Sequence, residues 1–513
     1  MKKSFTVSTI IIIIAGLIIK IIGFLTRVFI SNTVGAKGLG LYQLFYPFYS
    51  LVVLTLTSGI TVSQSRLISE QVAKKKTHGI KLITNSSFLI SFLSASLVGT
   101  FLFLLSENIA INIFGDQRLI LSLKVFSLFI PLVSLGGVLK GYFYGTGNIT
   151  PTAVSSILEQ VIRITVVLVF ASYALQFGLA YACLVLAIAL MAGEIFNLLL
   201  LFIYYVKETK TISPPKTKLF NFKKIKNIIN ISVPVSANRF VMSALTSIEV
   251  ILIKNALLQS GNDYIQSLEE FGRLTGMVMP MILFPMVFTN AISTTLVPAI
   301  SESQTLGDTK KRNNRISKAL LFSIVSGVIF TAVFLSYPSE IGWGVYRSVR
   351  SGELIYTMSI CCIFVYLQQT LIGILNGLEK QSILLCNTLA GVAVRIGSIF
   401  ILVPIYGIEG YIYGYIASSI FVSLLSFFYL KKTISLIISF SKWILKPLIL
   451  GGILLLFSSI FINITKLVFS DPRLIVFVIC GMLVSLGYFL MFFFKILEWK
   501  DIFFFTLNKK RRP

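Results

Sequence analysis

Positively charged side chains interrupt apolar segments of this chain that are long enough to cross a membrane. The first segment runs from Phe5 to Ile30 and contains Lys20 and Arg27, which are seven residues apart and therefore lie on nearly the same face of a helix. A charge at the centre of a membrane helix costs roughly 2.5–3.5 kcal/mol on insertion scales. Two charges on one face favour aqueous or anionic surroundings, so we expect this helix to line a cavity. Arg27 by itself is also explained by a side chain that reaches the near membrane surface.

Three more cations lie in later apolar segments and belong to the same predicted substrate-binding site: Arg239, Lys254 and Arg273. Arg239 is about eleven residues, or roughly 16 Å, into its segment, which is close to the middle of a bilayer. Arginine suits two-point binding of phosphate oxygens, and lysine supplies a compact charge. The five cations together predict a cavity that binds an anionic, phosphate-bearing substrate. The alternative is that some of them pair with acids in the spans or with carbonyl groups at helix ends.

Apart from three residues at each end, the apolar segments hold eight basic residues but only three acidic ones, Glu159, Glu194 and Glu249. Glu159 and Arg163 are spaced i,i+4 and are predicted to neutralise each other as a structural pair. Glu249 is predicted to bind a coupling cation, with Asn387 contributing a carbonyl oxygen, because hard cations such as Na⁺ prefer oxygen ligands. A buried acid can instead bind a proton, so either Na⁺ or H⁺ is the expected coupling ion. A plain pair between Glu249 and a nearby lysine is the open structural alternative.

The composition indicates an all-α, polytopic membrane protein. The chain has 513 residues, of which 56% are hydrophobic and only 12% charged, and its mean hydropathy is +0.90. Apolar runs of at least 18 residues recur along its whole length, which no soluble domain shows. The first run is too long for a cleavable signal peptide and carries charge in its apolar part.

No signature of a catalytic or metal site occurs in the sequence. It lacks a P-loop, a GxSxG elbow and an HExxH motif, so we expect neither an enzyme nor ATP-driven transport by this chain alone. The five cysteines have no metal-ligand spacing and are predicted to be packed free thiols. Membrane topology accounts for most of the net charge of +26, so nucleic acid is not an expected partner. No cofactor is expected beyond the coupling ion.

Fourteen membrane spans are predicted, at approximately residues 5–31, 41–65, 82–106, 119–140, 151–173, 177–206, 228–257, 268–300, 319–338, 352–376, 382–404, 408–430, 444–465 and 473–496. With the N terminus inside the cell, 31 of the 45 basic residues, Lys140 among them, fall in inner segments and six in outer loops. This bias predicts a multi-pass membrane protein with both termini in the cytoplasm.

An internal repeat with an offset of 232 residues divides the chain into two similar halves. Ile68-Ser69-Glu70 recurs as Ile300-Ser301-Glu302, Gly141 and Gly145 recur as Gly373 and Gly377, and Arg163-Ile164 recurs as Arg395-Ile396. The repeat predicts an N-terminal six-helix lobe at 1–206, a basic cytoplasmic linker at 207–227 and a C-terminal six-helix lobe at 228–432. Two extra helices and a basic tail follow at 433–513. Because six spans is an even number, the lobes are parallel and the substrate path is expected between them.

Several short motifs resemble the stage V sporulation protein B family. They are Gly23-Phe24 followed by Arg27, Gly40-Leu41-Tyr42-Gln43, Tyr46-Pro47, Gly59-Ile60, Gly141-Tyr142-Phe143, Thr150-Pro151-Thr152-Ala153 and Glu159-Gln160-Val161-Ile162-Arg163. These proteins are polysaccharide-biosynthesis members of the multidrug/oligosaccharidyl-lipid/polysaccharide (MOP) exporter superfamily and are related to MurJ-type lipid II flippases.

The resemblance implies the two-lobed, MATE-like fold and alternating access that moves an undecaprenyl-diphosphate-linked sugar to the outer leaflet. It also implies that cations of the first and eighth spans hold the diphosphate, and Lys20, Arg27 and Arg273 lie in those regions. The flippase branch has a basic residue in the middle of its second span, whereas the stretch Leu51 to Thr57 is uncharged here.

The leading hypothesis is therefore a flippase for a lipid II-like cell-wall or spore-cortex precursor. Its expected partners are the anionic lipid-linked substrate, membrane lipids and wall-synthesis enzymes. A cation-coupled multidrug exporter of the MATE type is the first alternative, but cationic cargo favours acids in the cavity, and the spans have a basic excess. A scaffold that recruits wall-synthesis enzymes without transport is the second alternative.

Overall fold

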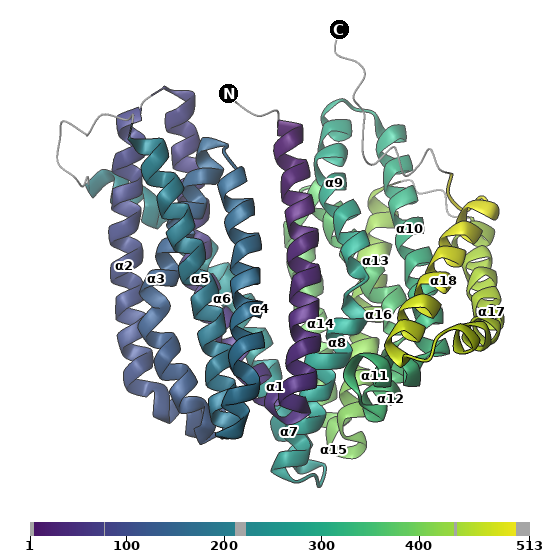
Figure 1. Ribbon diagram of the computed structural model, residues 1–513. Helices are drawn as coiled ribbons and strands as arrows, with labels where there is room; N and C mark the ends of the chain where they lie inside the picture. Colours follow the sequence, from purple (N-terminus) through teal and green to yellow (C-terminus); the bar gives the residue numbers. More distant parts are fainter. Residues whose placement is uncertain (1–4, 76, 211–221, 435–438, 499–513) are drawn as a thin grey trace. The chain divides into compact units, whose positions relative to one another are not determined.

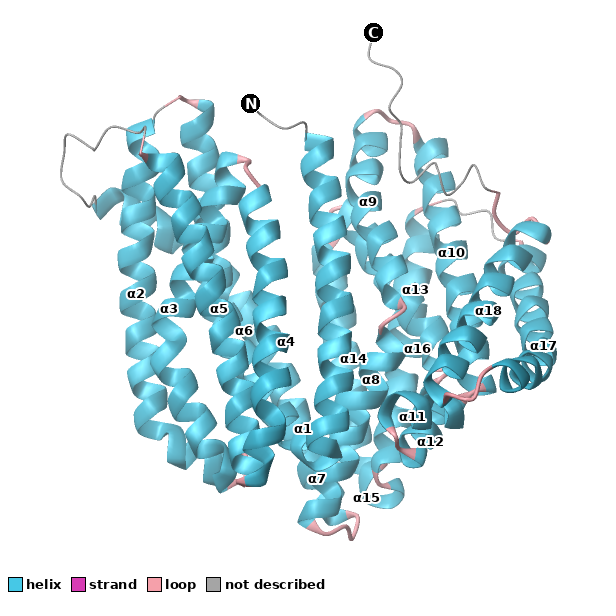
Figure 2. Ribbon diagram, in the orientation of Figure 1, coloured by secondary structure: helices cyan, strands magenta, loops and turns pink. Residues whose placement is uncertain are grey.

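The computed structural model describes residues 5–75, 77–210, 222–434 and 439–498. In these ranges the secondary structure is helical and no strand occurs (Figure 2). A helix satisfies its backbone polar groups internally, which is what a segment surrounded by lipid requires. The chain is an all-α, multi-pass membrane protein, as the composition predicts.

Two compact units make up the chain, Met1–Lys254 and Asn255–Pro513. The helices of the first unit are α1 (Phe5–Ala73), α2 (Thr77–Asn108), the π-helical turn η1 (Ile109–Ile113), the 3₁₀ turn η2 (Gln117–Leu119), α3 (Ile120–Thr146), α4 (Thr150–Gln176), α5 (Leu179–Thr209) and most of α6 (Phe222–Gln259). Within this unit α3 packs against α1, α2 and α5, and α4 packs against α1 and α5.

The second unit is a helical bundle with more breaks in its helices (Figure 1). Its elements are α7 (Tyr264–Gly272), the π-helical turn η3 (Arg273–Val278), α8 (Met279–Leu283), α9 (Met286–Thr305), α10 (Thr309–Ser336), α11 (Pro338–Tyr346), α12 (Val349–Met358), α13 (Cys361–Gly377), α14 (Gln381–Ile401), α15 (Val403–Tyr406), α16 (Ile408–Thr433), the π-helical turn η4 (Ser441–Leu445), α17 (Lys446–Val468) and α18 (Pro472–Phe493). The last two helices pack on each other and on α10.

Gly35 divides α1 into two straight parts. Its backbone has φ 74° and ψ −179° inside an otherwise helical run. A positive φ of this kind is easy for glycine and costly for other residues. The break therefore separates the first predicted span from the second. It occurs at a glycine, the residue type that adopts this backbone conformation most easily.

The number of spans agrees with the prediction once the bends are counted. Among the described residues, eleven helices are long and apolar enough to cross a membrane, or thirteen if two bent pairs each form one span. Division of the 60-residue candidate Ile14–Ala73 at Gly35 adds one more. The bent pairs are Tyr264–Leu283 with Met286–Thr305, at 57°, and Val349–Met358 with Cys361–Gly377, at 58°.

Matching hydrogen bonds in the two units reproduce the sequence repeat. The Ser69 hydroxyl donates to the Gly145 carbonyl, and the Ser301 hydroxyl donates to the Gly377 carbonyl, each at 3.1 Å. The Thr61 hydroxyl donates to the Gly137 carbonyl at 2.8 Å. Its counterpart in the second unit, 232 residues later, is a bond of 3.1 Å from Ser293 to the Gln369 carbonyl. The two halves therefore fold in the same way locally.

Some predicted features fall outside the described residues. These are most of the basic linker, at 211–221, and the C-terminal basic tail, at 499–513. The division between the compact units lies inside α6. The predicted lobe limits at 206 and 228 remain a prediction.

Candidate functional site

Lys20 and Arg239 are the most accessible of the predicted substrate-binding cations. Lys20 lies on the first part of α1 and Arg239 on α6, and both side chains are exposed. Among the described residues neither side chain forms an ion pair. Both lie on helices that are long and apolar enough to cross a membrane, and their charge is available to a ligand.

Arg27 has a different environment two turns further along α1. Its side chain is half-buried and lies within electrostatic range of the Tyr42 hydroxyl on the second part of the same helix. Tyr42 is followed by Tyr46, with ring centroids 5.7 Å apart. The guanidinium of Arg27 thus lies near polar groups of the first unit. A side chain that only reaches toward the membrane surface would not account for this position.

Lys254 has a partner within the first unit. Its side chain is 4% exposed, and Nζ donates a hydrogen bond to the Phe114 carbonyl in the turn that follows η1. Gly115 in that turn has φ +64°, and a Cβ atom built there would lie 2.8 Å from Nζ. This arrangement is the alternative that the sequence left open, a cation that binds backbone carbonyls.

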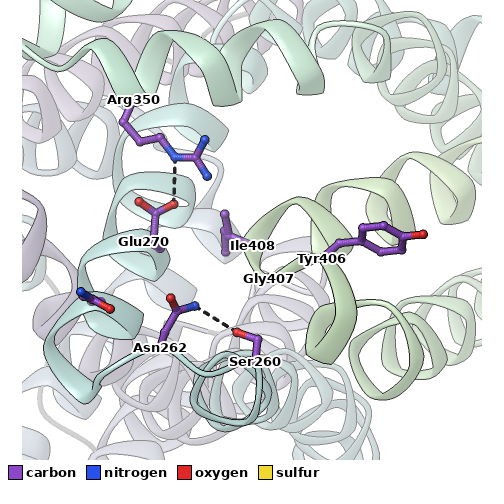
Figure 3. A pocket seen from close by; sticks show the side chains of 8 residues that line it. Ser260, Asn262, Glu270, Arg350, Tyr406, Gly407 and Ile408 are labelled. Carbon is purple, nitrogen blue, oxygen red and sulfur yellow. Dashed lines mark hydrogen bonds and ion pairs between the residues drawn. The ribbon is translucent and has the colours of Figure 1, made fainter.

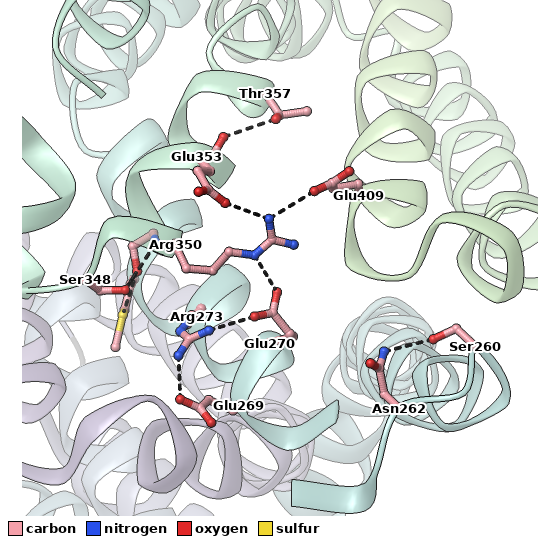
Figure 4. Close-up of polar contacts among 12 residues, drawn as sticks. Ser260, Asn262, Glu269, Glu270, Arg273, Ser348, Arg350, Glu353, Thr357 and Glu409 are labelled. Carbon is pink, nitrogen blue, oxygen red and sulfur yellow. Dashed lines mark hydrogen bonds and ion pairs between the residues drawn. The ribbon is translucent and has the colours of Figure 1, made fainter. Parts of the chain in front are cut away.

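Arg273 begins the π-helical turn η3 and is held by two acids of α7. Its Nη2 atom lies 2.5 Å from Glu269 Oε1 and its Nη1 atom 2.7 Å from Glu270 Oε1. Glu270 also accepts from Nε of Arg350 at 3.3 Å (Figure 4). The structure therefore places Arg273 in an ion-pair network of the second unit.

Arg350 is the centre of that network. Its Nη1 atom lies 2.8 Å from Glu353 Oε2 and 3.2 Å from Glu409 Oε1. With Glu270, these contacts join α7, α12 and α16 around one guanidinium (Figure 4). Sequence reasoning did not single out Arg350, because two of the three acids that contact it, Glu270 and Glu409, are distant in the chain.

A cavity of about 490 Å³ lies beside this network. Ser260, Asn262, Glu270 and Arg350 contribute polar groups to its wall, and the turn at Gly407 closes another part of it (Figure 3). The side chain of Tyr406 points away from these groups in the same view. The cavity is therefore polar, with hydrogen-bonding side chains from several elements of the second unit.

A cluster of four charged side chains in the first unit was only partly predicted. Arg163 lies 2.8 Å from Glu159, which confirms the expected pair on α4. Lys140 Nζ completes the cluster, 3.9 Å from Glu159 and 4.0 Å from Glu194 of α5. Sequence reasoning placed Lys140 at the end of a span, and α3 continues six residues past it to Thr146, so this lysine lies within the helix and contacts acids of α4 and α5.

Neutral polar groups complete the cluster. Asn197 Nδ2 donates to Glu159 at 2.6 Å, and the Tyr49 hydroxyl donates to Glu194 at 3.3 Å. Gly193 allows the approach of the two helices, since a Cβ atom there would lie 3.0 Å from the Glu159 carbonyl oxygen. Two acids and two bases balance in charge, so the cluster joins α1, α3, α4 and α5 without a net charge. Glu194, an acid in an apolar segment with no partner assigned from the sequence, was the available signal for a second cation.

The predicted coupling residues lie in different units. Glu249 of α6 is buried at 6% exposure. Asn387 of α14 is also buried, and its Nδ2 donates to Ser426 Oγ at 2.9 Å. That bond leaves the Asn387 carbonyl oxygen as an acceptor, which is the atom that a cation needs. Among the described residues no group of three His, Cys, Asp or Glu side chains is arranged to hold a metal ion.

Comparison with known families assigns the chain. Residues 5–304 match the family described as "Polysaccharide biosynthesis protein". The chain is 30% identical over 451 residues to stage V sporulation protein B of Bacillus subtilis (strain 168), which covers 86% of this chain and 87% of that protein. The chain belongs to the polysaccharide biosynthesis protein family. It is also 24% identical over 443 residues to the lipid II flippase MurJ of the same organism, with 80% of each chain covered.

Solved structures agree with this family assignment at the level of the fold. A lipid II flippase MurJ in an inward closed conformation superimposes with a TM-score of 0.66 at 16% identity and covers 96% of this chain and 99% of that one. An inward-facing multidrug resistance MATE family transporter of the MOP superfamily gives a TM-score of 0.67 at 15% identity, with 81% and 94% covered. The family member described here therefore has the MOP superfamily fold.

Proposed function

We propose that this polysaccharide biosynthesis family member is a flippase for an anionic, lipid-linked saccharide precursor of the cell wall or spore cortex. The carried lipid is a polyprenyl diphosphate that bears a sugar, as the lipid II flippase among its relatives suggests. Alternating access moves it from the inner to the outer leaflet, and the basic bias of the inner loops supports cytoplasmic termini.

One observation carries this proposal. In the described part of the first unit, the half-buried cations Lys140 and Arg163 are neutralised by acids, whereas Lys20 and Arg239 are exposed on candidate membrane-spanning helices and form no ion pair. A protein retains an uncompensated charge in the membrane at a cost of several kcal/mol, and such residues are usually functional. An anionic head group is the ligand that uses two such charges.

A cation gradient is the energy source that we propose for the cycle. Glu249 is proposed to bind the coupling ion, with the carbonyl oxygen of Asn387 as a further ligand if the ion is Na⁺, or to bind H⁺ by itself. Ion binding changes the charge or the hydrogen bonding of a buried group. It shifts the equilibrium between the inward-open and outward-open conformations only if the ion binds one conformation more tightly than the other. The protein's own residues thus supply both a head-group site and an ion site.

A reconstituted flipping assay tests the proposal. The full chain is placed in liposomes that contain fluorescent lipid II or a simpler undecaprenyl-diphosphate sugar, and the labelled lipid that reaches the outer leaflet is measured with an impermeant quencher. We expect flipping of at least one of these lipids, and loss of flipping in Lys20→Ala and Arg239→Ala. Gln381→Ala, which removes an exposed neutral amide from α14, is the matched control.

Two results would contradict the proposal. One is an absence of flipping for both lipids in liposomes that hold correctly inserted protein. The other is uptake of a cationic dye that is faster in Lys20→Ala than in the unmodified chain, because a cationic-drug exporter gains from the loss of positive charge. A scaffold would instead support wall synthesis in cells with either cation removed.

A further inference from the structure

The polar cavity of the second unit has hydrogen-bonding groups that its own side chains do not use. Asn262 Nδ2 donates one bond, at 3.0 Å, to Ser260 Oγ, which leaves its second N–H and its carbonyl oxygen. Gln266 Oε1 accepts from the Asp263 backbone N–H at 3.3 Å. Because that bond orients the amide, the amino group of Gln266 remains as a donor. In the described residues these remaining atoms have no partner.

Charge is balanced on the wall of this cavity. Glu270 and Arg350 both line it, and they pair with each other at 3.3 Å. The wall therefore presents one acid and one base that are already matched, which disfavours a small ion as the occupant. A ligand that uses the remaining donors and acceptors is neutral and carries several polar groups.

The position of the cavity relates it to the membrane. Ser260 to Gln266 follow α6, Arg350 begins α12, and Gly407 precedes α16. Each of these places lies between an odd-numbered span and the next in the predicted topology, and so on the outer side. At about 490 Å³ the cavity is within the range of small-ligand sites.

We propose that this cavity binds a neutral saccharide unit, of one or two sugar rings, on the outer side of the membrane. Sugar hydroxyls donate and accept hydrogen bonds, which matches the amides of Asn262 and Gln266 in the cavity wall. The inference rests on the proposed function, because it assigns the cavity to the sugar of the transported lipid after it has crossed. The diphosphate is held elsewhere, by the exposed cations of the first unit.

Titration of the purified full chain with N,N′-diacetylchitobiose tests this site. Saturation-transfer NMR measures the dissociation constant in detergent, without any lipid substrate. We expect Asn262→Ala and Gln266→Ala each to weaken binding roughly three- to tenfold, since a neutral hydrogen bond contributes that much. Gln381→Ala removes an exposed amide from α14 of the same unit, and it should bind as the unmodified chain does.

A labelling experiment guards against variants that fail to fold. Gln266→Cys is placed in a Cys386→Ser background, because Cys386 is an exposed free thiol. An impermeant maleimide labels only protein that is inserted with this site outside, and diacetylchitobiose should slow that labelling. No detectable chitobiose binding by the unmodified chain, or an affinity in both alanine variants equal to that of the unmodified chain, would overturn the proposal.

The outcome separates this proposal from the proposed function. Lys20→Ala should lose flipping and retain disaccharide binding, because Lys20 belongs to the other unit. If the disaccharide binds and the two alanine variants weaken it while no lipid is flipped, the saccharide site stands and the flippase assignment fails. If lipid is flipped but the disaccharide does not bind, the flippase assignment stands and the saccharide site fails.

Discussion

Lys140 Nζ lies 3.9 Å from Oε2 of Glu159, and this contact completes a partly buried cluster of two bases and two acids in the first unit. The side chain of Lys140 is 26% exposed and that of Glu159 is 8% exposed. In such surroundings, removal of one charge leaves an uncompensated partner, which costs more than the intact pair contributes. The cluster therefore stabilises the fold of the first unit because its two positive and two negative charges compensate each other.

That balance predicts the effect of changes at Lys140. Lys140→Met leaves two acids against one base, and we expect it to destabilise the first unit by about 3 kcal/mol. Lys140→Met combined with Glu194→Gln restores neutrality and should recover part of the loss. Thermal unfolding of the purified protein, followed by fluorescence-detected size exclusion, measures both. A double variant that is less stable than the sum of the single changes would show that the residues do not act as a cluster.

Close helix contacts predict which glycines tolerate a methyl group. A Cβ atom at Gly141 would lie 2.8 Å from the Thr61 carbonyl oxygen, and one at Gly373 would lie 2.9 Å from the Ser293 carbonyl oxygen. We expect Gly141→Ala and Gly373→Ala each to cost roughly 1–3 kcal/mol of stability through overpacking. Gly136→Ala is the control, since no atom lies within 4 Å of its Cβ position. Equal melting temperatures for all three variants would contradict the close contacts.

The topology predicts the side of the membrane on which two loops lie. Leu306, in the turn between α9 and α10, is 72% exposed, and Val349, at the start of α12, is 59% exposed. In a Cys386→Ser background, an impermeant maleimide added to intact cells should label Val349→Cys and not Leu306→Cys. Labelling of Leu306→Cys without lysis would show that the orientation of the second unit is reversed.

The predicted head-group site separates the cations by their partners. Lys20→Ala and Arg239→Ala should weaken binding of a lipid diphosphate roughly ten- to a hundredfold, because each charged hydrogen bond contributes about 1.5–3 kcal/mol. Lys20→Arg should be tolerated, whereas Arg239→Lys should bind less well if the planar guanidinium is used. Affinity measured by microscale thermophoresis in detergent tests both. Unchanged affinity in the two alanine variants, with normal expression, would mean that these cations are structural.

Lys254 contrasts with Lys20 and Arg239, because its charge already has a partner in the protein. Its ammonium group donates to the Phe114 carbonyl, so Lys254→Met leaves that buried carbonyl without its bond. We expect a loss of stability of about 1–3 kcal/mol with little change in lipid affinity. A large loss of affinity with normal stability would instead return Lys254 to the head-group site. The same pair of measurements applies to Arg273, whose guanidinium is held by Glu269 and Glu270.

The ion-coupling prediction concerns Glu249 and Asn387. Glu249→Gln removes the charge and keeps the shape, and we expect transport that no longer depends on a Na⁺ or proton gradient. Asn387→Ala should reduce the same dependence if its carbonyl oxygen is an ion ligand, while Ser426→Ala, which removes only the neighbouring hydroxyl, should not. Flipping rates under imposed gradients measure this. A rate equal to that of the unmodified chain in Glu249→Gln, under all gradients, contradicts the assignment.

The sequence by itself determined the membrane class, the repeat and most of the spans. These depend on hydropathy and spacing within single segments, so long apolar runs and the 232-residue offset were sufficient. It also identified the Glu159 and Arg163 pair, since both partners lie on one helix and their separation follows from helix geometry.

Only the tertiary structure decided which charges are neutralised. Lys140 acquires its acids because α3 lies against helices that begin at Thr150 and Leu179, and Lys254 acquires the carbonyl of Phe114 from a turn 140 residues earlier. Arg350 likewise meets Glu270 and Glu409 from two other elements. Coulomb energy depends on distance in space, and a sequence specifies that distance only between residues of the same element.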